Sequence, residues 1–244
     1  MKEWFKDWFS SEEYLSVYQH RNHEDAQKLL ELIIRETKLS KDASILDAAC
    51  GAGRHCINLA LWGFNVTGFD LSKSLLKKAK SDAALQKIEI DLFCADIRKI
   101  YLCKKFDLIL NLFTSFGYFN NDEENFCFVR TAYNLLNKNC YYVLDYLNAN
   151  FVINNLVPET IKEAKNKKIV ELRRIENGRV VKEITIQNGA KKNSYLESVQ
   201  LYSKEKIIAE FEKIGFNFDK LFGDYEGSVF NENKSPRLIL FFKR

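Results

Sequence analysis

The sequence lacks the patterns that mark several large classes of protein. Its six cysteines form no C-x-x-C pair and most lie inside apolar runs, which argues against a metal site or a disulfide framework and favours buried thiols. Free thiols are typical of a reducing compartment, so we expect a cytoplasmic protein. No stretch is long and apolar enough to cross a membrane, and residues 1–10 contain no continuous apolar core of a signal peptide.

The chain also lacks a strong excess of charge. With 37 basic and 33 acidic residues its formal net charge is only +4, which is too small and too evenly spread to point to a nucleic-acid partner. The one local basic cluster, residues 162–168, is interpreted as a solvated face. A length of 244 residues with 46% hydrophobic residues fits one α/β domain with an elaboration, or two small domains.

What the sequence does contain is a short apolar strand, residues 45–48, that runs into a glycine turn and then a helix. A turn of this kind, here with Gly51 and Gly53, presents backbone N–H groups and a helix N-terminus to a ligand. The third glycine of the dinucleotide fingerprint G-x-G-x-x-G is missing, because Cys56 stands in its place. This argues against a nicotinamide-dependent dehydrogenase. Asp70, at the end of the next strand, is placed to accept hydrogen bonds from both hydroxyls of a ribose.

Asp47, the glycine turn and Asp70 together resemble the first two motifs of the class I S-adenosylmethionine-dependent methyltransferases, many of which carry a glycine at the position of Ala49. The run from Asn111 to Phe119, N-L-F-T-S-F-G-Y-F, resembles a motif of small bacterial methyltransferases, some of which methylate sugar amines. The resemblance implies S-adenosylmethionine as the cofactor and a monomer or homodimer. It implies a small-molecule methyl acceptor that is an amine or a hydroxyl, with a sugar amine as one case. It implies cofactor contacts from Tyr18, Arg21, Asp47, Ala49, Gly51, Gly53, Asp70, Leu71, Asp96, Ile97 and Asn111.

Strand-like and helix-like patterns alternate through the first part of the chain. This alternation predicts an α/β fold with a Rossmann-like, doubly wound, mostly parallel sheet. We expect strands at residues 45–48, 66–70, 88–94, 106–112 and 140–147, and helices at residues 24–37, 54–62, 72–85 and 122–136.

The pattern then changes to three β-like runs, at residues 168–175, 180–187 and 195–202. Asn177-Gly178 and Asn188-Gly189 lie between them as hairpin turns, which predicts an inserted antiparallel β meander. A helix at 203–214 and an antiparallel pair of strands at 216–222 and 238–242 are expected to complete the fold at the sheet edge. We therefore assign residues 1–150 and 203–244 to the cofactor-binding domain, and residues 151–202 to a β cover over the substrate side.

The N-terminal residues 4–18 combine aromatic and charged side chains and predict a helix, with Ser10 and Glu13 spaced as a capping box. This segment is either a surface helix packed on the core or a lid over the cofactor. The family resemblance extends to it, because Tyr18 and Arg21 match a Tyr-x-x-Arg-like segment of related proteins.

Methyl transfer from a sulfonium is an in-line displacement that needs a dry, aligned site. Aromatic rings shape such a site and tolerate a cation, so we expect Phe113, Phe116 and Tyr118 to line the reacting centre. The expected acceptor contacts are Tyr118, Tyr202, Tyr225 and Arg237. An amine acceptor must arrive neutral or lose a proton to a base. The candidate bases are His55, Tyr118, Asp145 and Tyr225, and the spacing assigns the role to none of them.

Other functions share the cofactor half of this pattern. Amine-methylating DNA enzymes of this fold carry Asn/Asp-Pro-Pro-Tyr after the fourth strand, whereas residues 111–114 read N-L-F-T. An RNA or protein methyltransferase and a non-catalytic S-adenosylmethionine-binding module stay open as alternatives.

Overall fold

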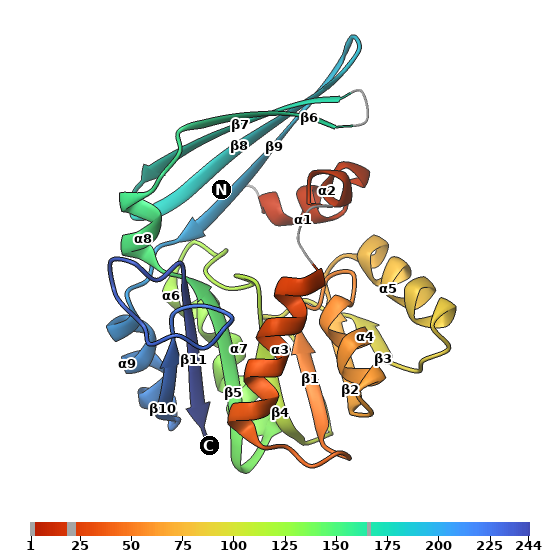
Figure 1. Ribbon diagram of the computed structural model, residues 1–244, viewed down its shortest axis with the longest axis vertical. Coiled ribbons are helices and arrows are strands. Elements are labelled where there is room, and N and C mark those ends of the chain that lie inside the picture. Colours follow the sequence, from red (N-terminus) through yellow and green to blue (C-terminus); the bar gives the residue numbers. More distant parts are fainter. Residues whose placement is uncertain (1–2, 19–22, 165–166) are drawn as a thin grey trace.

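The computed structural model describes residues 3–18, 23–164 and 167–244, which form a large and a small β-sheet (Figure 1). The strands of the large sheet are β1 (Ser44–Ala48), β2 (Asn65–Asp70), β3 (Asp91–Cys94), β4 (Phe106–Asn111), β5 (Leu136–Leu147), β10 (Asn217–Phe222) and β11 (Arg237–Lys243). Their order is β10-β11-β5-β4-β1-β2-β3. The strands from β5 to β3 pair in parallel, and β11 and β10 add antiparallel pairs at one edge. The predicted fold class is confirmed, with a topological switch between β1 and β4.

Helices cover both faces of this sheet (Figure 1). On one face lie α3 (His23–Thr37), α4 (Arg54–Leu61) and α5 (Lys73–Leu85), and on the other α7 (Cys127–Leu135) and α9 (Lys204–Ile214). Each face has its own buried apolar cluster. None of the helices in the described chain is long and apolar enough to cross a membrane.

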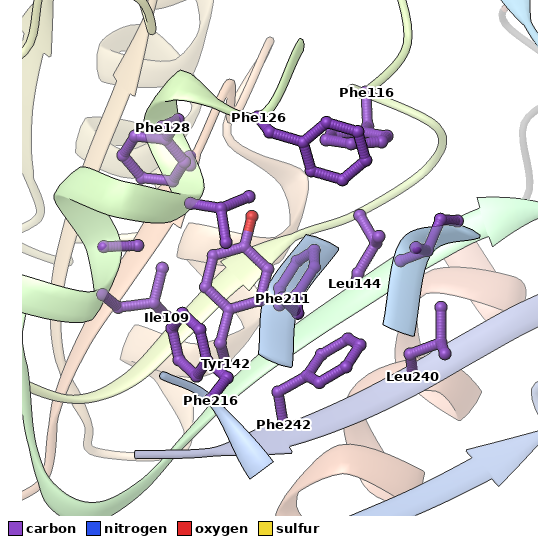
Figure 2. Packing of buried hydrophobic residues seen from close by; sticks show 14 of the residues in the cluster. Ile109, Phe116, Phe126, Phe128, Tyr142, Leu144, Phe211, Phe216, Leu240 and Phe242 are labelled. Atoms are coloured by element: carbon purple, nitrogen blue, oxygen red, sulfur yellow. The ribbon is translucent and has the colours of Figure 1, made fainter. Parts of the chain in front are cut away.

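The second of these faces is packed by aromatic rings (Figure 2). Phe211 of α9 stacks on Phe242 of β11 with ring centroids 4.0 Å apart, and Tyr142 of β5 meets Phe211 edge-on at 5.2 Å. All three side chains are fully buried. Because buried aromatic side chains contribute the most apolar area to a core, they fix α9 and the antiparallel edge against the parallel strands.

The small sheet contains four antiparallel strands and confirms the predicted meander. They are β6 (Glu159–Ala164), β7 (Lys167–Glu176), β8 (Arg179–Asn188) and β9 (Lys191–Gln200), and α8 (Ala149–Asn154) leads into them from β5. The sequence did not predict β6, because its one large apolar side chain, Ile161, is 56% exposed and gives no alternating signal. The second hairpin turn lies at residues 189–190, one residue later than predicted, because Asn188 pairs with Lys191. The division into a cofactor domain and a β cover stays a prediction.

Two predicted helices are interrupted in the structure. Residues 4–18 form α1 (Trp4–Phe9) and α2 (Glu12–Val17), and the N-cap of α2 is Ser11 rather than Ser10. The helix expected at 122–136 divides into α6 (Asp122–Asn125) and α7, and its N-cap is Asn121. In each case two neighbouring side chains can accept the capping hydrogen bond, so spacing alone could not choose between them.

The ends of two strands also differ from the prediction. β3 begins at Asp91 rather than at residue 88, and β5 begins at Leu136 rather than at residue 140. The early start of β5 comes from its partner, because Phe106 at the start of β4 pairs with Leu136.

The two N-terminal helices lie between the small sheet and the large one (Figure 1). Trp4, Phe5 and Trp8 of α1 are buried in one apolar cluster with side chains of β7 and β8, and the Trp8 ring packs against Tyr195 of β9 with centroids 4.5 Å apart. The Trp8 indole N–H also donates a hydrogen bond of 2.6 Å to Glu197 of β9. This placement supports the lid hypothesis, which stays a prediction.

Candidate active site

A cavity of about 1090 Å³ opens at the carboxyl ends of the parallel strands. The loops after β1, β2, β3 and β4 form its floor, and α1, α2 and the strands β7 to β9 contribute its roof. Ligands of open α/β sheets bind at this edge, at the topological switch. Pockets for single drug-sized ligands measure about 300–1,000 Å³, so the cavity has room for a cofactor and a second small molecule.

The glycine turn after β1 has the backbone that close approach of a ligand needs. Ala49, Gly51 and Gly53 have left-handed φ angles of 57°, 57° and 74°. No heavy atom lies within 4 Å of the position that a Cβ on Gly51 would take. Gly53 does not line the cavity, and a Cβ there would lie 2.7 Å from the Cβ of Ala79. We therefore assign Gly53 to the packing of α4 against α5, and Gly51 to the ligand side of the turn.

The Asp70 carboxylate ties this turn to the end of β2. Its Oδ2 accepts a hydrogen bond of 2.9 Å from the Gly51 N–H, and its Oδ1 accepts one of 2.7 Å from the Ser72 N–H. Burial raises the pKa of Asp70 despite these bonds. The cap of α5 is the Ser72 hydroxyl, which accepts from the Leu75 N–H at 3.3 Å. Asp70 lines the cavity, and each carboxylate oxygen has a second lone pair with which to accept from a ribose hydroxyl.

Asp47 and His55 form a buried pair beneath the turn. The Asp47 Oδ2 lies 3.9 Å from the His55 Nδ1 and accepts a hydrogen bond of 3.3 Å from the Cys56 thiol. Burial raises the pKa of Asp47 to about 7 and lowers the pKa of His55 to about 3. His55 is therefore neutral near pH 7, and its Nε2 has no hydrogen-bond partner among the described residues.

Asn111, at the end of β4, presents an unused acceptor at the switch point. Its Nδ2 donates to the carbonyl oxygens of Ala48 and Ser115, each at 3.2 Å, which fixes the orientation of the amide. Its Oδ1 is buried and has no partner within the described chain. Because buried polar atoms are normally paired, a donor on a bound molecule would complete this site. That Asn111 meets the ammonium and Asp70 the ribose of S-adenosylmethionine stays a prediction.

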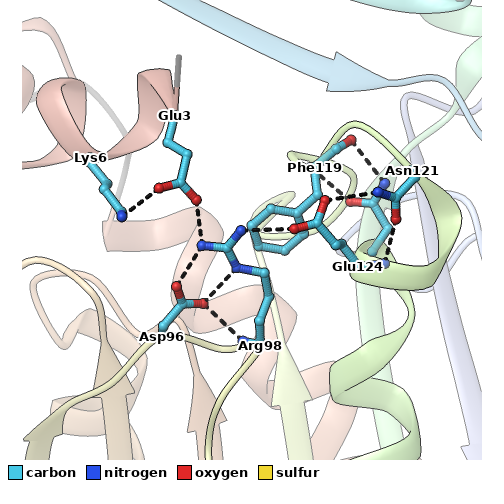
Figure 3. A network of polar contacts seen from close by, with 8 residues as sticks. Glu3, Lys6, Asp96, Arg98, Phe119, Asn121 and Glu124 are labelled. Carbon is cyan, nitrogen blue, oxygen red and sulfur yellow. Dashed lines mark hydrogen bonds and ion pairs between the residues drawn. The ribbon is translucent and has the colours of Figure 1, made fainter. Parts of the chain in front are cut away.

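Asp96, in the loop after β3, is held by Arg98 (Figure 3). Its Oδ1 accepts from the Arg98 backbone N–H and Nε, both at 3.0 Å, and its Oδ2 from Nη2 at 2.7 Å. Burial alone would raise the pKa of Asp96, but the hydrogen bonds from Arg98 have the larger effect, so the pKa of Asp96 lies below its usual value. The same guanidinium pairs with Glu3 beside α1 and Glu124 of α6. Asp96 thus anchors the N-terminal segment, and its contact with an adenine stays a prediction.

The three aromatic residues expected at the reacting centre all line the cavity but have different neighbours. The Phe116 ring packs inward against Phe126, with centroids 5.1 Å apart. Tyr118 packs against α1, with its ring centroid 5.1 Å from that of Trp4. Phe113 lies next to the glycine turn, under the guanidinium of Arg54 at 4.3 Å.

Three of the four expected acceptor contacts, Tyr118, Tyr225 and Arg237, line the cavity, and Tyr202 does not. Tyr202 is buried, and its hydroxyl donates to Asp122 at 2.5 Å and accepts from Asn125 at 3.0 Å. It lies beyond the end of β9, so it faces α6 and joins that helix to the core. We replace the predicted acceptor contact of Tyr202 with this structural role.

Five of the remaining expected cofactor contacts also line the cavity: Tyr18, Asp47, Ala49, Leu71 and Ile97. Arg21 lies outside the described residues.

Sequence reasoning missed a charged pair in the roof of the cavity. Lys182 of β8 and Glu197 of β9 are register partners that line the cavity, with Nζ and Oε2 2.5 Å apart. The Tyr18 hydroxyl donates to the other oxygen of Glu197 at 2.5 Å. The correct register of the hairpin would have revealed this pair. The turn predicted from the sequence lies one residue too early, so it pairs Lys182 with a different residue of the next strand.

Residues 45–139 match the family model of a methyltransferase domain. This segment contains the glycine turn, Asp70, Asp96 and Asn111, so the resemblance to methyltransferases drawn from the sequence is confirmed. The whole fold is similar to a solved S-adenosylmethionine-dependent methyltransferase from Clostridium acetobutylicum ATCC 824, with a TM-score of 0.83 and 19% identity over 95% of this chain and 97% of that chain.

Two curated relatives match parts of the chain. A dTDP-3-amino-3,4,6-trideoxy-alpha-D-glucopyranose N,N-dimethyltransferase of Streptomyces venezuelae is 28% identical over 103 residues, which are 41% of this chain and 40% of the relative. A ubiquinone biosynthesis O-methyltransferase of Coxiella burnetii (strain Dugway 5J108-111) is 39% identical over 70 residues, 28% of this chain and 30% of the relative. The chain thus matches less than half the length of these relatives, and their names differ in the acceptor atom.

The hydrogen bonds of Asp70 make the first prediction. Asp70→Ala is expected to weaken S-adenosylmethionine binding about ten- to a hundredfold, because charge-assisted hydrogen bonds contribute about 1.5–3 kcal/mol. It is also expected to lower the melting temperature, since the Gly51 and Ser72 amides lose their acceptor. Titration calorimetry and ligand-free thermal unfolding measure the two effects. An unchanged dissociation constant would contradict the cofactor assignment.

The buried pair beneath the turn predicts two opposing pH dependences. The folded pKa of Asp47, about 7, lies above the usual 3.8, so its stabilising contribution is present at low pH and is lost as the pH rises through this range. The folded pKa of His55, about 3, lies below the usual 6.5, so its contribution is lost as the pH falls through that range.

Between pH 3.8 and pH 6.5, the usual pKa values of the two groups, Asp47 and His55 therefore change the free energy of unfolding with pH in opposite directions. We consider the free energy of unfolding of each variant minus that of wild type. This difference should rise with pH for Asp47→Asn and fall with pH for His55→Gln, each by at most about 1.4 kcal/mol per pH unit. Urea-unfolding midpoints at about pH 4.5 and about pH 6, without ligand, measure these slopes. Identical slopes in the three proteins would contradict the assigned pKa directions.

Proposed function

We propose that this protein is an S-adenosylmethionine-dependent methyltransferase that methylates the amine of a small molecule, with a sugar amine as the candidate acceptor. The observation that carries the proposal is the buried Asn111 oxygen, which has no partner among the described residues and lines the same cavity as Asp70 and Gly51, a cavity large enough for two molecules. The matching methyltransferase domain model over residues 45–139 supports the same reading.

The strand ends supply what the cofactor needs. Asp70 would accept from the ribose hydroxyls, and the Asn111 Oδ1 from the ammonium. Leu71 and Ile97 offer apolar surfaces at the place where the resemblance expects the adenine. A cationic ammonium nearby would favour the ionised form of Asp47. When bound, the cofactor supplies a methyl group activated on a sulfonium.

The walls of the cavity exclude water from that group. The aromatic rings of Phe113 and Tyr118 come from the floor, and those of Trp4 and Phe9 come from the lid segment. A dry, preformed site supports methyl transfer by holding the acceptor in place and by removing competing water. The enclosure by α1, α2 and the small sheet also favours a small acceptor over RNA or a protein.

The electrostatics of the cavity favour an amine over a hydroxyl acceptor. In the described part of the chain each carboxylate that lines the cavity already has a partner: Asp47, Asp70, Asp82, Asp96, Glu124 and Glu197. A hydroxyl needs a base to become a nucleophile, whereas a neutral amine already carries a lone pair. The name of the Streptomyces relative agrees with an amine, and that of the Coxiella relative with an oxygen.

The polar groups on the acceptor side suit a hydroxylated amine. Lys182 and Glu197 in the roof, and Arg237 and Tyr225 in the wall, place polar side chains at separate positions around the cavity. Such a distribution matches the hydroxyls of a sugar ring better than an extended apolar chain.

The cofactor assignment predicts selective binding. S-adenosylmethionine and S-adenosylhomocysteine are expected to bind, and NAD much more weakly, because Cys56 replaces the third glycine of the dinucleotide turn. Asn111→Ala should weaken binding of the first two ligands, and Asn134→Ala, on the exposed side of α7, serves as the matched control. Titration calorimetry with the three ligands tests this, and tighter binding of NAD would overturn the proposal. Binding of the cofactor without methylation of any amine in a panel would contradict the proposed amine acceptor.

Among the described residues no carboxylate that lines the cavity is without a partner, and this predicts how the rate depends on pH. For an amine that arrives neutral, kcat/KM should rise with pH up to the pKa of the acceptor itself. Two acceptor amines that differ by about two pKa units should therefore give profiles displaced by about two pH units. A common inflection near the Asp47 pKa of about 7 for both amines would instead indicate a protein base. Initial rates of S-adenosylhomocysteine formation measure the profiles.

A further inference from the structure

The loop after β4 contains two consecutive residues in an unfavourable backbone conformation. Phe113 and Thr114 have φ angles of 53° and 63°, in the left-handed region that side chains with a Cβ rarely adopt. Thr114 is β-branched, which makes the conformation still less favourable. A conformation of this kind persists only where the surrounding structure enforces it, and it is often found at functional sites.

Asp145, near the end of β5, is the residue that enforces this conformation. Its side chain is fully buried, and its Oδ2 accepts a hydrogen bond of 2.9 Å from the Phe113 N–H. Its backbone carbonyl accepts one of 3.0 Å from the Thr114 N–H. Both amides of the strained pair are therefore held by one residue of the neighbouring strand.

Arg237, at the start of β11, closes the arrangement from the other side. Its Nε donates to the Asp145 Oδ1 at 2.7 Å, and its Nη2 donates to the Thr114 Oγ1 at 3.0 Å. The Tyr225 hydroxyl donates to the Asp145 Oδ2 at 3.3 Å. Charge-assisted bonds of this type are short and directional, so they restrain the geometry of the loop. We call Asp145 and Arg237 the Asp145–Arg237 clamp.

The clamp determines where the Phe113 ring lies. That ring is 4.3 Å from the Arg54 guanidinium and 5.0 Å from the His55 ring on the side of the glycine turn. Its centroid is also 5.6 Å from that of Tyr225, an expected acceptor contact. The Phe113 ring therefore contacts both the start of the helix after the glycine turn and a residue of the expected acceptor wall, in one cavity. Asp145 does not itself line that cavity.

We infer that Asp145 is a positioning residue, which acts with Arg237 to hold Phe113 and Thr114 in the strained conformation so that the Phe113 ring aligns the acceptor with the cofactor. This inference rests on the proposed function. It also removes Asp145 from the candidate general bases, because both of its carboxylate oxygens already accept hydrogen bonds, from Arg237, Phe113 and Tyr225.

The first test compares Asp145→Asn with Asp107→Asn. Asp107, at the other end of β4, also accepts from a backbone amide, Ser44 at 2.9 Å, and from a side chain, Asn137 at 2.8 Å, but lies away from the cavity. In Asp145→Asn the amides of residues 113–114 should exchange with deuterium much faster, measured without ligand. S-adenosylmethionine affinity should stay within about threefold, and kcat should fall up to about a hundredfold with a smaller change in KM. Asp107→Asn should leave the amide exchange of residues 113–114, the S-adenosylmethionine affinity and kcat unchanged.

The second test keeps the inference falsifiable if Asp145→Asn fails to fold. Thr114→Gly removes the strain, because glycine adopts positive φ without penalty, whereas Thr114→Ala retains it. Both variants lose the hydrogen bond to Arg237. Thr114→Gly should therefore melt at a higher temperature than Thr114→Ala and yet turn over more slowly, because its loop is free to leave the clamped conformation.

The outcomes separate the clamp from the proposed function. Turnover that simply follows melting temperature in the two Thr114 variants, or unchanged amide exchange in Asp145→Asn, would overturn the clamp as a positioning device. If wild type methylates no amine, the proposed function fails, while the exchange and melting measurements still decide whether the clamp holds the loop.

Discussion

The hydrogen bonds that the Asp70 carboxylate accepts from the Gly51 and Ser72 amides are the constraint on which the site depends. They join the turn after β1 to the loop after β2, so two adjacent strand ends become one rigid surface. Once that surface is fixed, the amide of Asn111 can reach across the topological switch to Ala48. The floor of the cavity is thus a continuous set of backbone contacts, which orients the side chains above it.

Burial has a double effect on the polar groups around this floor. It favours a protonated Asp47 and a neutral His55, so both side chains can sit beneath the turn without an unpaired charge. It also leaves the Asn111 oxygen without a partner in the described part of the chain, at a cost to the ligand-free protein that a bound donor would offset. A site with these properties is less favourable when empty than when filled, which is what pre-organisation for a ligand requires.

The parts of this molecule that depend on local sequence could be predicted, and the parts that depend on packing could not. The glycine turn, the alternating strands and the Gly178 hairpin follow from the backbone preferences of a few neighbouring residues. Once those strands are placed, Asp70 is identified as the residue that ends the second strand. The split of the N-terminal helix between Phe9 and Glu12 depends on which serine reaches an amide. Lys182 and Glu197 meet only through the register of a hairpin, and β6 is ordered by its partner strand. Asp145 looked like a possible base in sequence, and only its partners assign it to the backbone of the β4 loop.

The N-terminal helix α1 is fastened on two sides, by Glu3 to Arg98 below and by Trp8 to Glu197 above. Its aromatic face fills the space between the two sheets. If α1 is the predicted lid, opening the cavity to a ligand the size of a nucleoside would break both attachments and expose several buried rings to water, which would make the open form rare. Exchange of product for fresh substrate, rather than bond making, would then set the pace of the catalytic cycle.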